Sequence, residues 1–135
     1  MTTWLMDTAL FKTLGSPRTR QWFEDNDASV FLSAASLSEI VATIAKIPMG
    51  QRQRALALRA WFDELASRYA DRIHPVEPEI AVRAGELMPS VHNGHHRHRL
   101  HDALLVATAQ IHGHGLLTRR EGIFGPWIKV PIATV

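Results

Sequence analysis

Short apolar runs alternate with helical patterns along this chain. Each run is short enough to be a buried strand. Five runs are expected to form strands: Trp4–Met6, Val30–Leu32, Ile73–Val76, Leu116–Thr118 and Ile128–Val130. Pro75 cannot donate a hydrogen bond, so it limits the third run to a strand end or a sheet edge.

Between these runs the apolar pattern takes a helical period. One stripe at the spacings i, i+3, i+4, i+7 and i+11 predicts a long helix, and its members are Leu58, Trp61, Phe62, Leu65 and Tyr69. Pro78 suits the first turn of another helix. From Ala103 to Ile111 the chain is small and apolar nearly all round, which is typical of a buried central helix.

Strands that alternate with helices predict an α/β fold, with a mostly parallel central sheet of about five short strands covered on both faces. Right-handed crossovers place the carboxyl ends of such strands along one edge, where ligands bind. The chain has 135 residues and shows no repeat or Gly/Ser linker, so residues 1–135 are expected to form one domain.

Composition excludes several classes of protein. Cysteine is absent, which rules out a disulfide scaffold, a thiolate zinc site and a cysteine nucleophile. No apolar stretch approaches the roughly 20 residues that span a bilayer, and the first residues do not resemble a signal peptide, so we expect a cytoplasmic protein without a membrane partner. The net charge is only +2, which creates no strong overall field.

Three acidic residues lie where the predicted strands and helices meet. Asp7 follows the first strand, Glu39 lies one helical turn past the second, and Asp102 opens the buried helix. In a parallel sheet all three can converge on one crevice, where their charges would repel unless a cation neutralised them. A hard ion such as Mg²⁺ prefers oxygen ligands, and it can activate water and stabilise a phosphoryl group in transfer.

Each acid also has a purely structural interpretation. Ser36 and Glu39 match the spacing of a helix capping box. Asp7 can cap a helix N-terminus, and Asp102 can be favoured there by the helix dipole. The sequence alone leaves both interpretations open for each residue.

Several blocks of the sequence resemble a known family when taken in order. The blocks are Leu5-Met6-Asp7-Thr8, Leu32-Ser33-Ala34 with Ser38-Glu39-Ile40, the run from His101 to Ala109, and Gly113-x-Gly115-Leu116-Leu117-Thr118-Arg119. They are similar to the signature blocks of PIN-domain toxins of the VapC type, and Ile47-Pro48-x-Gly50-x-Arg52 resembles the linker of that family into its long helix. The resemblance covers nearly the whole chain.

This resemblance implies a PIN-like three-layer α/β/α sandwich and a metal-dependent endoribonuclease that cleaves structured RNA, the toxin of a type II toxin–antitoxin pair. It implies a VapB-like antitoxin as partner, a homodimer, and a hetero-oligomer with the antitoxin. By the same resemblance Asp7 and Asp102 hold Mg²⁺ or Mn²⁺, and Glu39 completes the cluster or orients water.

The chain departs from the family pattern at three positions. Ala9 stands where the family often has asparagine, and Arg120 and Ile123 replace polar or acidic residues after Thr118-Arg119. Glu121 substitutes as a fourth acid if the loop shifts by one residue; otherwise Arg120 offers a cation near the site. These departures favour an alternative function, a PIN module that binds RNA or an antitoxin without efficient turnover.

Other reaction classes find less support. An aspartyl-nucleophile phosphatase would need a second aspartate at position 9, and a nucleotide-binding domain would need a glycine-rich phosphate loop, which is missing.

A basic segment precedes Asp102. Residues 92–101 hold five histidines and two arginines and no acid. Three interpretations stay open: a solvated loop, contact with RNA phosphates, or a transition-metal site built from His95, His96, His98 and His101. The candidate RNA contacts are Arg97, Arg99, Arg119 and Arg120.

Overall fold

The computed structural model describes residues 2–13, 17–90, 99–120, 124 and 132–133. Its centre is a five-stranded parallel sheet with the strand order β3-β2-β1-β4-β5. The strands are β1 (Trp4–Met6), β2 (Val30–Ser33), β3 (Ile73–His74), β4 (Gly115–Leu117) and β5 (Ile132–Ala133). The predicted parallel sheet is confirmed.

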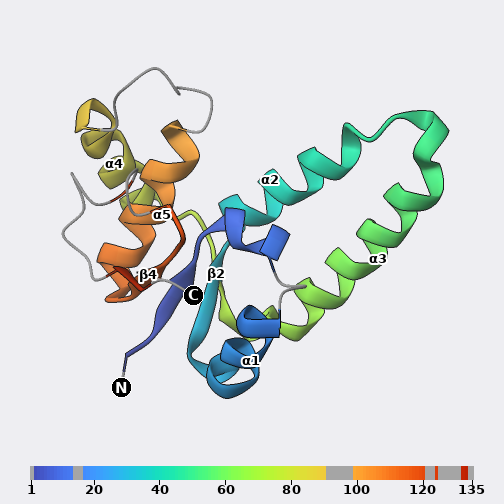
Figure 1. Cartoon of the computed structure of the whole chain (residues 1–135). Helices are drawn as coiled ribbons and strands as arrows, with labels where there is room; N and C mark the ends of the chain where they lie inside the picture. The colour runs from blue at the N-terminus through green and yellow to red at the C-terminus, as the bar shows by residue number, and fades with distance from the viewer. Residues whose placement is uncertain (1, 14–16, 91–98, 121–123, 125–131, 134–135) are drawn as a thin grey trace.

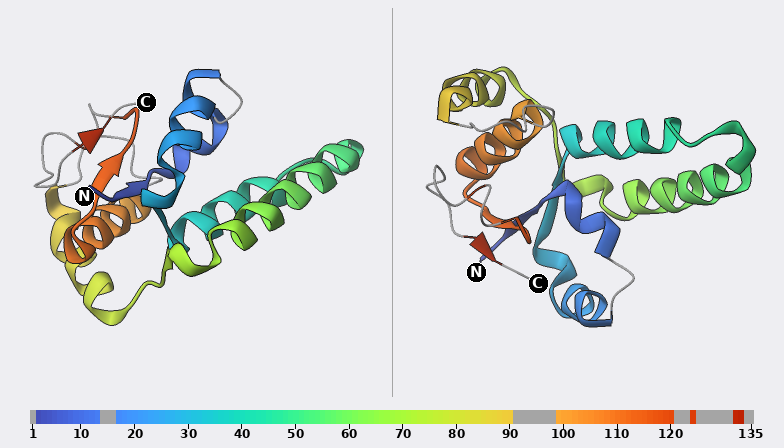
Figure 2. Two further views of the ribbon diagram at one scale, coloured as in Figure 1. Left: turned by 90° about the horizontal axis from the view of Figure 1, so that it is seen from below. Right: turned by 45° about the horizontal axis from the view of Figure 1, so that its top comes forward.

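Five α-helices surround this sheet in the described part of the chain. They are α1 (Pro17–Asn26), α2 (Ala34–Ala45), α3 (Arg52–Arg68), α4 (Pro78–Leu87) and α5 (Arg99–His112). Figure 1 shows that α2 and α3 run antiparallel as a long hairpin that projects from the body, and Figure 2 shows the same projection from two other sides. A short 3₁₀ turn, Met49–Gln51, joins the two helices at the tip.

Alternating side chains of the strands supply two separate cores. Leu5 and Leu116 point into a cluster with α4 and α5, whereas their neighbours Met6 and Leu117 point into a cluster with α1, α2 and α3. This period of two is what a strand buried on both faces requires. The three-layer α/β/α arrangement is therefore confirmed.

Most predicted elements occur where the sequence places them. The apolar stripe lies on α3, and Pro78 occupies the first turn of α4. Helix α5 begins at Arg99, so Asp102 lies inside its first turn rather than before it. The run 128–130 falls outside the described residues, and the fifth strand that the structure shows is Ile132–Ala133.

The capping box predicted for Ser36 and Glu39 is wrong. Ser33 is the N-cap of α2, and its hydroxyl accepts a hydrogen bond from the amide of Ala35 (3.1 Å). The hydroxyl of Ser36 instead accepts a hydrogen bond from Thr8 (2.8 Å), which ties α2 to the 3₁₀ turn after β1. The N-cap Ser33 is the last residue of β2, so α2 begins directly after the strand and Glu39 lies in its second turn.

The order of the strands creates a switch point beside β1. The chain moves from β1 to β2 and β3 on one side, and β4 then pairs with the other side of β1. Ligands of open parallel sheets bind outside the carboxyl ends of the strands at such a point. Among the described helices, none combines the length and apolar character of a bilayer-spanning segment.

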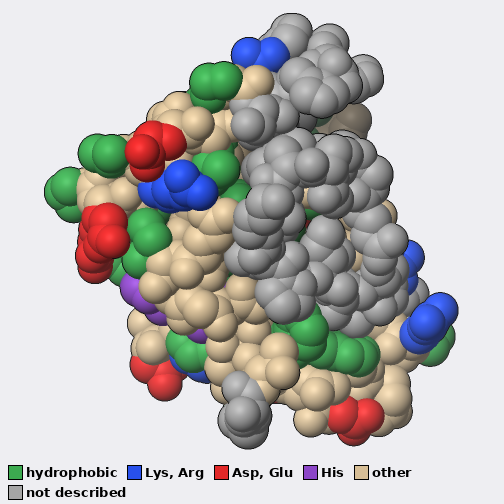
Figure 3. All heavy atoms as spheres, turned by 90° about the vertical axis from the view of Figure 1, so that its left-hand side faces the viewer, with side chains coloured by type: hydrophobic (Ala, Val, Ile, Leu, Met, Phe, Trp, Pro, Cys, Tyr) green, Lys and Arg blue, Asp and Glu red, His purple; other side chains and the backbone are tan. Residues whose placement is uncertain are grey.

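Three histidines pack together where α5 returns to the sheet. The Nε2 atoms of His74 and His114 lie 2.8 Å apart, Nδ1 of His114 lies 2.6 Å from the hydroxyl of Thr3, and the rings of His74 and His112 stack at 3.7 Å. Phe31 stacks on His114 from β2. Figure 3 shows a narrow strip of histidine atoms reaching the surface on this side of the molecule.

The contact between His74 and His114 requires at least one neutral imidazole. A hydrogen bond between two Nε2 atoms needs one donor and one acceptor, which two protonated rings cannot provide. Burial lowers the pKa of His114 to about 4, with His74 and His112 adding to the effect. Burial, and then His112, also lowers the pKa of His74, against the opposing charge of Glu77.

We predict that the fold loses stability as the pH falls from about 6.5 towards 4. Unfolded histidine binds a proton near pH 6.5, whereas folded His114 stays neutral down to about pH 4. Protonation therefore favours the unfolded state below pH 6.5, and His114 alone lowers the free energy of unfolding by roughly 3 kcal/mol by pH 4. Above pH 6.5 this loss is absent. Urea unfolding at a series of pH values measures the slope. A His114→Gln variant should be less stable at pH 7.5 but flatter with pH, and equal slopes would contradict the prediction.

Candidate functional site

Asp7 lies at the carboxyl end of β1 and is fully buried. Its backbone amide donates a hydrogen bond to the carbonyl of Leu117, which extends the pairing of β1 with β4 by one residue (3.0 Å). Its carboxylate accepts hydrogen bonds from the amide of Ala9 (3.3 Å) and from the hydroxyl of Thr118, the first residue after β4 (2.7 Å). Asp7 therefore has the local capping contact predicted for it and a second, tertiary set of contacts.

Asp102 reaches the same edge from the first turn of α5. Helix α5 leads into β4 through a tight turn at Gly113, so its N-terminal end lies over the carboxyl ends of the strands. Gly113 has a φ of 71°, a conformation that favours glycine. The carboxyl group of Asp102 is buried, as is that of Asp7.

Arg120 lies between these two carboxylates. Its Nε donates a hydrogen bond to Asp7 Oδ2 (2.8 Å), and its Nη2 donates to Asp7 Oδ1 (2.6 Å) and to Asp102 Oδ1 (2.9 Å). The Nη2 atom of Arg120 thus contacts both acids, so the carboxylates of Asp7 and Asp102 converge on one atom. This geometry agrees with the predicted approach of the two residues, and their catalytic and metal-binding roles stay predictions.

The charges of this group are strongly coupled. Burial raises the pKa of Asp102, as do the charges of Asp7 and Glu39, while the charge and hydrogen bond of Arg120 oppose that rise. Burial alone would lower the pKa of Arg120, but the hydrogen bond to Asp7 and the charges of both acids outweigh it and raise that pKa. Arg120 is therefore a permanent cation at this edge.

Glu39 lies beside the pair but has another partner. Its Oε2 is 3.5 Å from Nδ1 of His101, which connects α2 to α5. Both side chains are partly exposed, so this contact adds little to stability. Glu39 influences Asp102 through its charge.

The donor set does not fit a divalent cation in this arrangement. Mg²⁺ needs oxygen ligands at about 2.1 Å, and the oxygens of Asp7 and Asp102 that face each other accept hydrogen bonds from Arg120. Within the part of the chain that the structure describes, no group of three or more acidic or histidine side chains could hold a metal ion. The arginine occupies the position that a metal would need.

The remaining candidates divide into described and undescribed residues. Arg99 starts α5, and Arg119 donates a hydrogen bond to the hydroxyl of Thr19 (3.1 Å). Glu121, Arg97 and the histidines of residues 92–98 lie outside the described residues. Arg120, which the sequence predicts as an RNA contact, binds the carboxylates of Asp7 and Asp102 instead.

The sequence predicted Arg120 as a cation near the site, and the structure agrees, but sequence reasoning missed Thr118 as a second partner of Asp7. Thr118 donates to Asp7 and accepts a hydrogen bond from the amide of Arg120 (2.9 Å), so one hydroxyl fixes both members of the ion pair. Thr118 ends the run Leu116–Thr118 that the sequence predicts as a strand, and this position was the available signal.

Comparison with known proteins gives a consistent result. A model of the PIN domain family matches residues 8–123. A chain of FitAB bound to an IR36 DNA fragment has a TM-score of 0.79 at 20% identity, with 98% of this chain and 94% of that chain covered. A chain of DNA-bound VapBC from Salmonella typhimurium has a TM-score of 0.76 at 18% identity, with coverages of 99% and 98%.

A toxin–antitoxin complex from Klebsiella pneumoniae gives a TM-score of 0.63 at 26% identity, covering 98% of this chain and all of that chain (100%). No curated protein sequence matches the chain.

We predict that Asp7→Asn lowers the free energy of unfolding by about 2–4 kcal/mol. The substitution preserves shape but leaves the partly buried Arg120 with a single carboxylate partner, and removing the charge of one member of such a pair is costly. Glu39→Gln is the matched control and should cost less than about 1 kcal/mol, because its pair with His101 is partly exposed. Guanidinium unfolding measures both, and equal losses would contradict the prediction.

Proposed function

The chain belongs to the PIN domain family, and on this premise we propose that it is a toxin nuclease of the VapC type that cleaves RNA and is controlled by an antitoxin. The family match covers most of the chain, and the similar folds come from toxin–antitoxin complexes. The resemblance of the ordered sequence blocks to VapC-type toxins supports the same assignment.

One observation carries this proposal. Asp7 Oδ1 and Asp102 Oδ1 lie 2.6 and 2.9 Å from Nη2 of Arg120, at the switch point of the sheet. Two buried carboxylates at the ligand-binding edge of a parallel sheet are costly for the fold, so their presence there favours a chemical role.

We assign the catalytic roles to Asp7, Glu39 and Asp102, with Glu121 as a further acid outside the described residues. Mg²⁺ or Mn²⁺ is the cofactor that the family resemblance implies, and Asp7 and Asp102 are the residues that would hold it. With Arg120 between them these residues do not fit a divalent ion, so no step of the proposal passes through a metal.

Contact with RNA is assigned to the basic residues around this edge. Arg99 lies in the same helical turn as Asp102, and Arg119 lies next to Arg120 at the end of β4. The positive charges of these side chains would bind the phosphate backbone of RNA and hold the RNA strand near the carboxylates. Arg97 belongs to the same expectation from the sequence.

The test is cleavage of total RNA by the purified protein freed of antitoxin. We predict discrete cuts that fall by about 100-fold or more in Asp102→Asn, because this variant keeps the shape of the site and removes one of its charges. Asp63→Asn, an exposed acid on α3 paired with Arg59, is the matched control and should cleave as the parent does. Undiminished cutting by Asp102→Asn would contradict the proposal.

The Arg120 contacts favour a second candidate function, a PIN module that binds RNA or an antitoxin without turnover. Both inward carboxylate oxygens are already satisfied, which leaves them weak as bases or ligands. In this case the same assay would show RNA retarded on a native gel but not cut.

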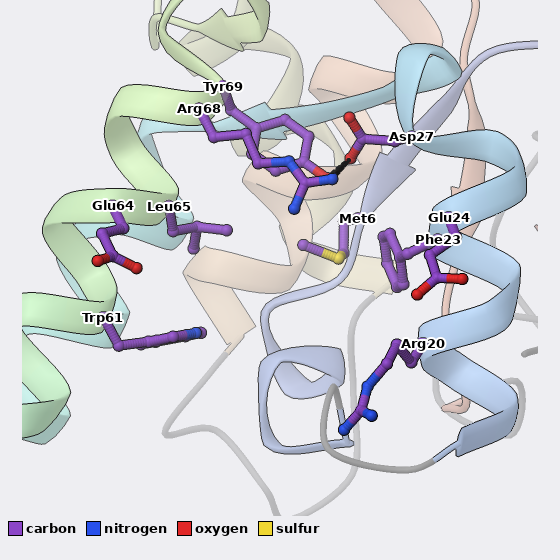
Figure 4. Close-up of a pocket in the computed structure, with 10 residues that line it drawn as sticks. All are labelled: Met6, Arg20, Phe23, Glu24, Asp27, Trp61, Glu64, Leu65, Arg68 and Tyr69. Atoms are coloured by element: carbon purple, nitrogen blue, oxygen red, sulfur yellow. Dashed lines mark hydrogen bonds and ion pairs between the residues drawn. The ribbon is translucent and has the colours of Figure 1, made fainter.

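We place the antitoxin in a groove of about 350 Å³ between α1 and α3. Figure 4 shows its apolar floor and its charged walls facing each other. The floor is formed by Met6, Phe23, Trp61 and Leu65, and the charged residues include Arg20, Glu24, Glu64 and Arg68. Such a mixture suits an amphipathic peptide segment. The homodimer and the hetero-oligomer with the antitoxin stay predictions.

We predict that Arg20→Glu weakens binding of the antitoxin encoded by the adjacent open reading frame by about tenfold, since the charge at one position of the groove is reversed and the α1 wall becomes negative. Arg83→Glu, on α4 at the opposite face of the sheet, should change the affinity less than about twofold. Calorimetry on the purified pair measures both. An equal effect of the two reversals would remove the groove from the interface.

A further inference from the structure

The guanidinium of Arg120 has several partners, through its Nε and Nη2 atoms and through its face. Two nitrogens bind Asp7 in a forked arrangement, one of them also binds Asp102, and the plane lies 4.8 Å from the ring centre of the buried Phe124. The backbone amide of Arg120 is fixed by Thr118. Forked arginine–carboxylate contacts are among the strongest charge-assisted hydrogen bonds.

These contacts use the same atoms that a metal ion would use. Asp7 Oδ1 and Asp102 Oδ1 both point at one centre, which is the requirement for bridging a cation. A divalent ion at that centre would lie within van der Waals distance of the guanidinium and be repelled by it. The two cations therefore exclude each other.

We propose that Arg120 is the resident cation of this acidic edge and that it keeps divalent metal ions off Asp7 and Asp102. The inference rests on the proposed function only in treating this edge as the functional site. It concerns which cation binds there, and it does not depend on RNA being cut.

The charge balance supports permanent occupancy. Asp7 and Asp102 bring two negative charges into a buried region, and Arg120 returns one positive charge directly between them. Arg120 belongs to the same folded chain, so its effective concentration at the site is far higher than that of an ion in solution, and it competes with the ion at an advantage. A metal must then displace a side chain that is already bound on several sides.

The test measures Mn²⁺ binding to the full chain without RNA, by the loss of the free Mn²⁺ signal in electron paramagnetic resonance. We predict that Arg120→Gln binds Mn²⁺ at least about tenfold more tightly than the parent, because the competing charge is gone. Arg119→Gln is the matched control: it removes a neighbouring arginine that contacts Thr19 and not the carboxylates, and should change the affinity less than about twofold.

Adding Asp102→Asn to Arg120→Gln identifies the site. The gain in affinity should disappear in the double variant, because the second carboxylate ligand is lost. Parent protein that binds Mn²⁺ as tightly as Arg120→Gln would overturn the inference, and so would a gain that survives Asp102→Asn or that appears equally in Arg119→Gln.

A second measurement covers the case in which Arg120→Gln does not fold. The side-chain Nε–H resonance of Arg120 in the parent protein is followed by nuclear magnetic resonance during titration with Mg²⁺. We expect it to keep its hydrogen-bonded position through millimolar Mg²⁺. A saturable shift to the position of free arginine at lower concentration would overturn the inference.

The two proposals fail separately. Absence of RNA cutting by every variant would reject the nuclease while leaving the Mn²⁺ comparison intact. Equal Mn²⁺ affinity of the parent and Arg120→Gln would reject Arg120 as the resident cation, whether or not RNA is cut.

Discussion

Two carboxylates buried at one edge of a sheet repel each other, and this edge depends on the positive charge that lies between them. Asp7 cannot be solvated, because it is fully buried, and Asp102 is nearly so. Burial raises the pKa of Asp102, and Arg120 is the group that opposes the rise. The positive charge of the guanidinium thus offsets part of the cost of two carboxylates in a region that water does not solvate.

The parallel topology explains why distant residues meet at this point. Strand β4 pairs with β1, so Thr118 lands beside Asp7, while α5 must return over the sheet to reach β4 and carries Asp102 in its first turn. The two cores hold this geometry from opposite faces, since neighbouring residues on β1 and β4 point into different clusters. The positions of Asp7 and Asp102 therefore follow from packing in the two cores and not from contacts between the carboxylates.

Sequence patterns predicted the fold well, because short buried strands and an apolar helix carry strong periodic signals. They located Asp7 and Asp102 at the correct edge for the same reason. They failed at the start of α2: Ser33, the last residue of β2, caps the helix, and the hydroxyl of Ser36 is used in a tertiary contact with Thr8 instead. The sequence placed Arg120 near the site as a cation, but its forked contact with Asp7 could not be predicted, since that geometry depends on the backbone conformation after β4.

Arg120 departs from the family pattern, and its contacts explain how the chain still keeps Asp7 and Asp102 together at this edge of the sheet. A site that brings two carboxylates to one point is well formed for a metal ion and equally well formed for a guanidinium, because both need converging oxygens. An acid at position 120 would add a third negative charge and make a mobile cation necessary for balance. Arginine at the same position supplies the cation from within the chain, and the hydroxyl of Thr118 and the ring of Phe124 hold it there. The identity of one residue after β4 therefore decides whether this edge needs an ion from solution.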